Sequence, residues 1–140
     1  MNTNEIDRFV RSVCRHHFQG VYSIDTLPDT PRLLISNTDP SDKPGTHWIA
    51  ISVDSERRGE YFDSFGRQPP AVFEDYMNKH CISWSYNAKQ LQSVVSSFCG
   101  AYCCVYCMLK CKGFSLNRII NLFTNDTGYN DSIVRDFICG

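Results

Sequence analysis

A stretch of thirteen residues near the middle of the chain most constrains the fold. Residues 99–111, CGAYCCVYCMLKC, carry a single charged side chain, Lys110, close to their end. A helix that is apolar on every side offers no face to water and has to be buried. Lys112 and Gly113 follow, as is typical of a helix C-terminus. The stretch therefore predicts a buried central helix around which the other elements pack.

Size and composition predict one globular domain over residues 1–140. Hydrophobic residues make up 42% of the chain and aromatic residues 13%, which excludes a disordered chain. A net charge of -1 gives no overall attraction for nucleic acid, so we expect no nucleic-acid partner. We expect no membrane partner either, because no run of about 18 apolar residues occurs.

Cysteine usage predicts a reducing compartment. The chain has eight cysteines, and its polar first residues show no signal peptide. We therefore expect free thiols and an intracellular location, in the nucleus or the cytoplasm.

The remaining patterns indicate an α+β fold. Two apolar runs joined by a charged turn that ends in Gly59 predict an antiparallel hairpin. A first helix begins with Asn4 as its cap and ends at Gly20, and turn-forming residues predict a surface loop over 37–45. Strands are expected at 33–36, 47–53, 60–65 and 81–86, and helices at 4–18, 72–78, from Ser115 and from Asp131, the last one burying Ile133, Val134, Phe137 and Ile138.

Cys99 is the candidate nucleophile, because it stands where the central helix begins. The positive end of a helix dipole favours a thiolate, and Gly100 would leave room for a substrate carbonyl beside it. A free cysteine is more commonly a small buried hydrophobe, so Cys99 alone decides little. His47, at the start of a strand, is the candidate base, and Asp63, near the end of the next strand, would orient its ring. Gln92 could donate to an oxyanion together with the Cys99 backbone N–H.

The order and spacing of these residues resemble the adenovirus protease (adenain) family. The resemblance rests on Gly45-Thr46-His47-Trp48, on Tyr61 to Gly66, on Gln92 seven residues before Cys99, and on Cys99 to Cys104. Gly20 to Pro28 is similar to a further segment of that family. The shorter versions carried by Polinton/Maverick-type elements, which are related to SUMO- and ubiquitin-like proteases, are the most similar.

The resemblance implies a cysteine endopeptidase that cleaves polypeptides at glycine-containing sites, in the maturation of capsid-type proteins. It implies the papain-like/adenain-like fold, with a central mixed sheet flanked by helices and the nucleophile at the N-terminus of the buried one. The catalytic residues would be His47, Asp63, Gln92 and Cys99, with no metal or other cofactor. The substrate would be a capsid-type protein precursor, and the enzyme could be packaged in a virion.

Three departures from the family bear on these expectations. Asp63 stands where adenain has glutamate, Phe98 replaces the aspartate that SUMO- and ubiquitin-like proteases carry before the cysteine, and the chain is short. Cys81 lies at a position where adenain bonds an activating peptide through a disulfide. Packing is the alternative reading of Cys81, as for any strand cysteine.

Two other classes stay open. One is an isopeptidase that removes ubiquitin-like modifiers from conjugates with the same four residues. The other is a non-catalytic binding or zinc module, for which Cys104-Val105-Tyr106-Cys107 would need a second pair of ligands from Cys14, His16 and His17.

Overall fold

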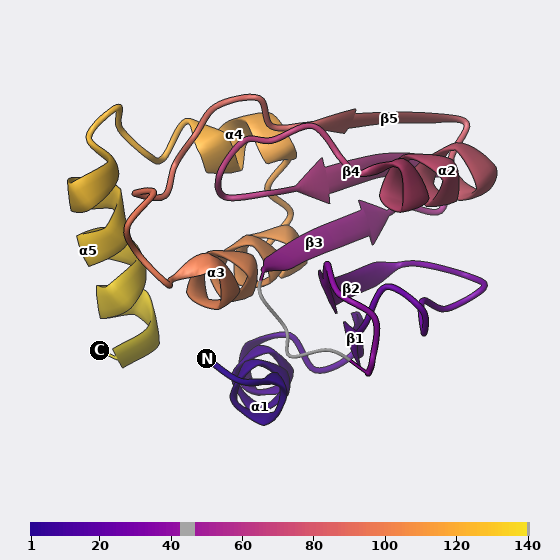
Figure 1. Ribbon diagram of the computed structural model, residues 1–140, viewed down its shortest axis with the longest axis horizontal. Coiled ribbons are helices and arrows are strands. Elements are labelled where there is room, and N and C mark those ends of the chain that lie inside the picture. Colours follow the sequence, from indigo (N-terminus) through magenta and orange to yellow (C-terminus); the bar gives the residue numbers. More distant parts are fainter. Residues whose placement is uncertain (43–46, 140) are drawn as a thin grey trace.

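The computed structural model describes residues 1–42 and 47–139, and it shows a five-stranded mixed sheet flanked by helices (Figure 1). The predicted α+β class is confirmed. The strands follow one another across the sheet in chain order. The strands are β1 (Phe18–Tyr22), β2 (Leu33–Asn37), β3 (Trp48–Val53), β4 (Arg58–Phe62) and β5 (Ser83–Tyr86), and the helices are α1 (Thr3–Val13), α2 (Ala71–His80), α3 (Cys99–Cys111), α4 (Leu116–Ile120) and α5 (Thr127–Cys139).

The centre of the sheet is antiparallel and its two outer pairs are parallel. Strand β3 runs antiparallel to both β2 and β4, whereas β1 is parallel to β2 and β5 is parallel to β4. The predicted hairpin is therefore confirmed, with Ala50 opposite Phe62. This register brings the residues just before β3 close to those just after β4.

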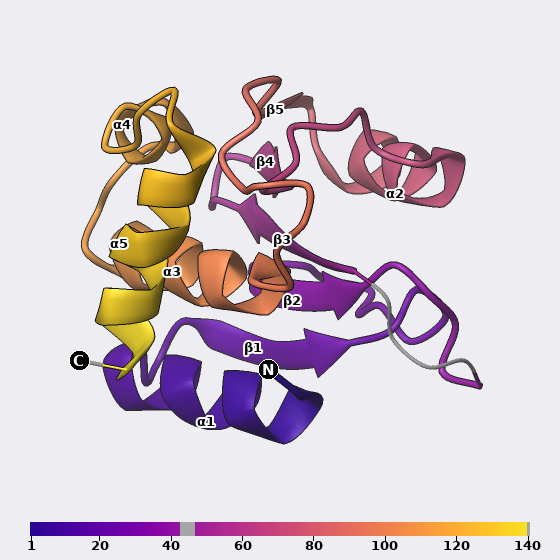
Figure 2. The same ribbon diagram turned by 60° about the vertical axis from the view of Figure 1, so that its left-hand side comes forward.

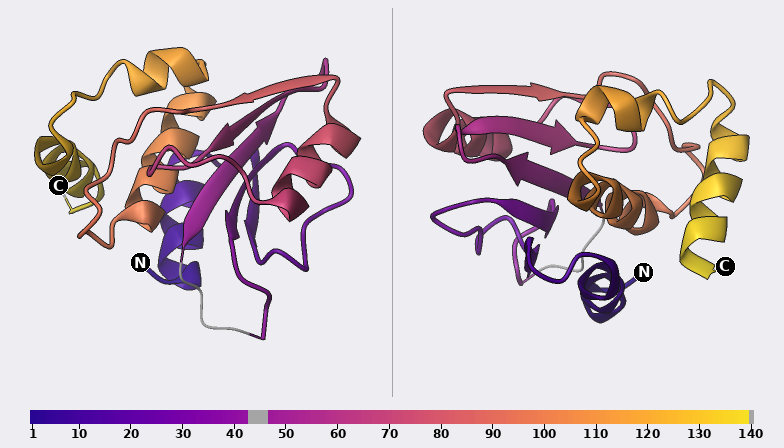
Figure 3. Two further views of the ribbon diagram at one scale, coloured as in Figure 1. Left: turned by 45° about the horizontal axis from the view of Figure 1, so that its top comes forward. Right: turned by 180° about the vertical axis from the view of Figure 1, so that it is seen from behind.

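Helices cover both faces of the sheet, as Figure 3 shows. Helices α1 and α3 pack on one face, where Ile35, Ala50 and Phe62 meet the apolar side of α3. Helix α2 packs on the opposite face, where Phe73 and Met77 contact Tyr61. In Figure 2, α5 and α1 lie against different sides of α3, so α3 is enclosed between the sheet and other helices.

Helix α3 has the predicted bounds and the predicted burial, with every residue from Gly100 to Cys107 buried. Gly100 also has a packing role. A methyl group at this position would lie 3.1 Å from Ile6 Cδ1 and 3.2 Å from Trp48 Cδ1. The missing side chain therefore lets α1 and β3 approach α3 closely.

The first helix is shorter than predicted. It ends at Val13, and Asn2, not Asn4, caps it through a reciprocal capping box with Glu5. Residues 18–22 form β1, which the sequence pattern did not indicate, because a strand at a sheet edge needs little apolar alternation. Gly20 lies inside this strand with φ +143° and does not end a helix.

The last helix begins four residues earlier than the expected Asp131, at Thr127. Val134 is buried as predicted, whereas Phe137 is 50% exposed. Of the loop predicted over 37–45, residues 43–45 lie outside the described residues. Within residues 1–42 and 47–139, no helix is long and apolar enough to cross a membrane.

One pair of cysteines departs from the expectation of free thiols. Cys14, at the end of α1, and Cys111, at the end of α3, form a disulfide with their Cα atoms 5.9 Å apart. The two helices lie side by side and bring these ends together. The other six cysteines are free thiols.

Candidate active site

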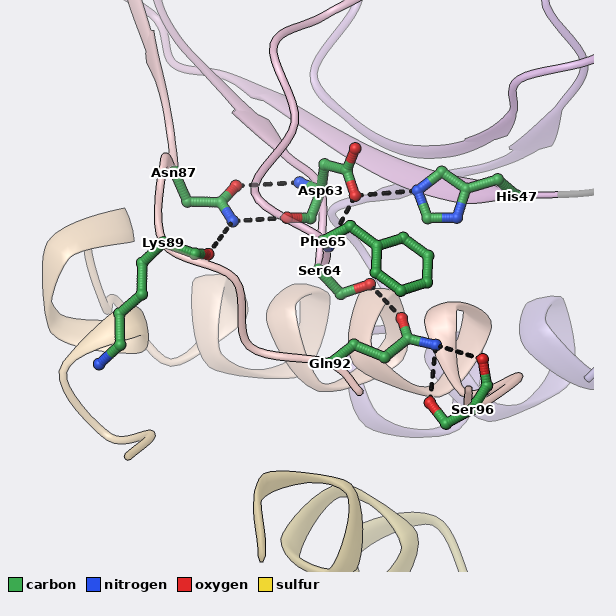
Figure 4. Close-up of polar contacts among 8 residues, drawn as sticks. All are labelled: His47, Asp63, Ser64, Phe65, Asn87, Lys89, Gln92 and Ser96. Carbon is green, nitrogen blue, oxygen red and sulfur yellow. Dashed lines mark hydrogen bonds and ion pairs between the residues drawn. The ribbon is translucent and has the colours of Figure 1, made fainter. Parts of the chain in front are cut away.

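The structure brings three of the four predicted residues into one hydrogen-bonded group. His47 immediately precedes β3, Asp63 immediately follows β4, and Cys99 is the first residue of α3. His47 Nε2 lies 2.9 Å from Asp63 Oδ1 (Figure 4). Both side chains are largely shielded, at 14% and 5% exposure, so water competes little for this contact.

Cys99 also forms a side-chain hydrogen bond with His47. Burial by itself would lower the pKa of His47, but hydrogen bonds to Asp63 and Cys99 outweigh it and raise the pKa to about 9. Burial by itself would raise the pKa of Cys99. The His47 hydrogen bond and the backbone N–H groups of Trp48 and Gly100 outweigh that effect and lower the Cys99 pKa. A raised His47 pKa beside a lowered Cys99 pKa favours an imidazolium–thiolate pair over a neutral pair.

Asp63 is held on both sides by groups that the sequence pattern did not single out. Its Oδ1 also accepts from the Phe65 backbone N–H at 2.8 Å. Asn87, which is 2% exposed, accepts from the Asp63 N–H at 2.9 Å and donates to the Asp63 carbonyl oxygen at 2.5 Å. Asn87 directly follows β5, and only its polar character after an alternating run marks it in the sequence. These bonds fix the carboxylate that faces His47.

Gln92 is fully buried and lies beside the same group, but its amide is already engaged. Its Oε1 accepts from Ser64 Oγ at 2.5 Å. Its Nε2 lies 2.9 Å from Ser96 Oγ and 3.1 Å from the Ser96 carbonyl oxygen (Figure 4). The structure thus places Gln92 near Cys99, with its donor turned toward Ser96.

A cleft of about 350 Å³ opens over these groups. The ring of Phe65 lies 5.0 Å from that of His47, centroid to centroid. Trp48, which follows His47 in the chain, forms another part of the wall. The complete lining is Met1, His47, Trp48, Phe65, Gln92, Ser96, Ser97 and Cys99.

Three other cysteines of α3 belong to the core. Cys103, Cys104 and Cys107 are all fully buried, and burial raises the pKa of each thiol. No three His, Cys, Asp or Glu side chains among residues 1–42 and 47–139 are grouped so that they could hold a metal ion. The zinc module would have used Cys14, which is in a disulfide.

Cys81 is a free thiol with 7% exposure at the end of α2. It packs in the cluster of α2 and the sheet with Met77, and a methyl group on Gly59 would collide with its sulfur. Burial raises the pKa of Cys81. These surroundings fit the packing role better than a disulfide with an activating peptide.

Comparison with known proteins identifies the fold. No protein-family model and no curated protein sequence matches the chain. Among solved structures, the pS273R protease of ASFV superimposes with a TM-score of 0.66 at 18% identity, covering 92% of this chain and 63% of that one. In a second structure of that protease the TM-score is 0.55 at 24% identity, covering 74% and 43%. The chain thus spans less than two thirds of the pS273R protease in both comparisons.

Two bacterial structures share this fold over more of the chain. The central domain of Lpg1148 from Legionella pneumophila has a TM-score of 0.61 at 15% identity, covering 99% of this chain and 93% of that one. ChlaDub1 from Chlamydia trachomatis has a TM-score of 0.57 at 20% identity, covering 96% and 74%. The chain therefore has the α+β fold of a viral protease, with Cys99 at the N-terminus of its buried central helix, as predicted.

Proposed function

We propose that this protein is a thiol endopeptidase in which Cys99 is the nucleophile, His47 the general acid and base, and Asp63 the orienting carboxylate. The observation that carries the proposal is the position of the His47 ring. Its Nε2 is bonded to Asp63 at 2.9 Å, and a second hydrogen bond joins the ring to Cys99 in the same cleft. A cysteine, a histidine and a carboxylate in this order are the parts that acyl transfer by a thiolate requires.

The mechanism follows from the charges of the group. The Cys99 thiolate attacks the scissile carbonyl carbon, and the carbonyl oxygen takes up the negative charge. Collapse of the tetrahedral intermediate breaks the C–N bond while His47 gives its proton to the leaving amine. His47, now neutral, takes a proton from water, whose oxygen attacks the thioester. The acid product leaves and the imidazolium–thiolate pair is restored. Asp63 stabilises the charged ring throughout.

The developing oxyanion needs donors, and two are close to Cys99. The Cys99 backbone N–H is at the first position of α3, where an N–H has no partner within the helix. Gln92 supplies the second donor once its Nε2 exchanges Ser96 for the substrate oxygen. This exchange is local, because Ser64 continues to hold the other end of the amide. Substrate binding therefore completes the oxyanion site.

The substrate is a polypeptide that contains glycine at the cleavage site. Two observations support glycine: the resemblance of the His47-Trp48 and Cys99-Gly100 segments to adenain, and the Trp48 and Phe65 side chains that line the cleft around Cys99. A role in processing capsid-type precursors is proposed from the adenain resemblance. The shared fold with a protease of ASFV is compatible with it.

The test compares turnover of a glycine-containing capsid-type peptide by the wild-type protein and two variants. Cys99→Ala removes the nucleophile and should abolish cleavage while the melting temperature is retained. Cys139→Ala changes a free, exposed cysteine on α5 and should leave kcat/KM unaltered. Cleavage that survives in Cys99→Ala would refute the proposal. A Gly-Gly-linked ubiquitin-like fusion, assayed in parallel, would identify an isopeptidase if it alone were cleaved.

A further inference from the structure

A second cavity adjoins the catalytic cleft. It encloses about 470 Å³ and shares Met1 and Trp48 with the cleft above Cys99. Its other walls come from the start of α1, the end of β1 and the segment after β2. The polar lining residues include Asn2, Thr3, Ser23, Thr26, Asn37 and Ser41.

Backbone pairing places Asn37, which lines this cavity, next to the catalytic residues. It is the last residue of β2 and pairs with Trp48, the residue that follows His47. The backbone N–H of the next residue, Thr38, donates to the His47 carbonyl oxygen at 2.9 Å. A chain segment that enters the cavity therefore lies within a few residues of a scissile bond placed at Cys99.

The Asn37 amide carries an unused donor. Asn37 is 5% exposed, and its Oδ1 accepts from the Asp39 N–H at 2.8 Å, which fixes the orientation of the amide. The Nδ2 atom has no acceptor anywhere in residues 1–42 and 47–139. Buried donors without acceptors are costly and rare, so such a group next to a cavity needs an explanation.

Tyr61 provides a useful contrast, because its hydroxyl is the other buried group with no partner in the same described ranges. That hydroxyl belongs to the apolar cluster on the α2 face, with Phe73 and Met77, and Tyr61 does not line the cavity. Asn37 combines an unused donor with a cavity beside the nucleophile. This combination points to a ligand atom that accepts a hydrogen bond.

We propose that Asn37 is a specificity-determining residue of the endopeptidase, and that the cavity receives an uncharged polar side chain of the substrate, asparagine or glutamine. The inference rests on the proposed function. Lysine and arginine have no acceptor atom to offer Nδ2. Aspartate and glutamate have one, but burying their charge costs more than burying a neutral amide. The hydroxyl and amide groups of the lining suit a side-chain amide, which both accepts and donates.

The test measures kcat/KM for peptides that differ at a single residue, scanned over the positions flanking the scissile glycine. Glutamine is compared with methionine, which has a similar shape and no amide. The wild-type protein should prefer glutamine at one position by about tenfold, equivalent to about 1.4 kcal/mol. Asn37→Leu should reduce the ratio to within about twofold. Asn37→Asp, which replaces the donor with a carboxylate, should turn the preference toward lysine, a change that a merely structural role would not produce.

The control is Asn117→Asp, the same chemical change on an exposed position of α4, and it should keep the glutamine preference. Ratios are taken on each variant by itself, so a loss of stability does not alter them. Two results would overturn this inference: a glutamine-to-methionine ratio of kcat/KM that is unchanged in both Asn37 variants, or no preference in the wild-type protein. If Cys99→Ala abolishes cleavage in the same experiments, the proposed function still stands. If the wild-type protein cleaves no peptide, the proposed function and the inference fail together.

Discussion

Replacing Asp63 with asparagine should destabilise the charged form of the His47 ring without moving the ring. Asparagine can still accept from the His47 Nε2–H and from the Phe65 N–H, so the geometry of the loop is retained. The negative charge that stabilises the imidazolium is lost. Burial, which opposes the charged ring, then has only the Cys99 contact against it, and the pKa of His47 should fall from about 9 toward its usual 6.5 or below.

The structure gives the size of the effect. A rise in the His47 pKa from 6.5 to about 9 corresponds to about 3 kcal/mol of extra stabilisation of the charged ring. Because the folded-state value is the higher one, this stabilisation is fully present below pH 6.5 and is lost as the pH rises through about 9. The Asp63→Asn variant should lose most of it, and at pH 7 its free energy of unfolding should fall by about 1–3 kcal/mol.

The assay is the rate at which iodoacetamide alkylates Cys99, followed by mass spectrometry from pH 5 to pH 10. In the wild-type protein the lowered pKa of Cys99 should make the thiol reactive at pH 7. In Asp63→Asn the rate at pH 7 should fall at least about tenfold, since the imidazolium partner is missing. Asp75→Asn, on the exposed face of α2, is the matched control. If the alkylation rate of Cys99 depends on pH in the same way in the wild-type protein and in Asp63→Asn, the ion-pair reasoning is refuted.

Three further predictions concern the support of the site. Asn87→Ala removes two hydrogen bonds to the Asp63 backbone and should cost about 2–3 kcal/mol in urea unfolding while kcat falls; unchanged kcat would contradict a positioning role. Cys14→Ser opens a disulfide that spans a separation of 97 residues and should lower stability by about 2–5 kcal/mol without reductant, whereas equal stability of both proteins in non-reducing buffer would exclude the bond. Gly66→Ala places a side chain at φ +70° and 2.7 Å from the Lys89 backbone, so the melting temperature of the variant should fall. An unaltered melting temperature would show that this turn relaxes freely.

The central helix and the hairpin could be predicted from the sequence because their signals are local. Thirteen residues without a polar face define α3, and a charged turn between two apolar runs defines the β3–β4 pair. The hairpin register then brings His47 and Asp63 together. The same register could not show that Cys99 meets them, because that contact depends on how α3 packs on the sheet.

The parts that escaped prediction depend on contacts between distant residues. Asn87 holds Asp63 from 24 positions away, and Cys14 meets Cys111 only because α1 and α3 lie side by side. The donor of Gln92 is directed by Ser96, whose position depends on the loop before α3. The strand over residues 18–22 exists because β2 offers it an edge for parallel pairing. None of these contacts leaves a periodic signal in the sequence.

The most direct test of the account is a rapid-quench single turnover with the wild-type protein in excess over a glycine-containing peptide, followed by mass spectrometry of the acid-quenched protein. The account predicts a transient adduct with the mass of the N-terminal half of the peptide, attached to Cys99 as a thioester. The adduct should form as the C-terminal half is released and disappear as the N-terminal acid appears. Cleavage without any adduct on Cys99, or an adduct on another residue, would contradict it.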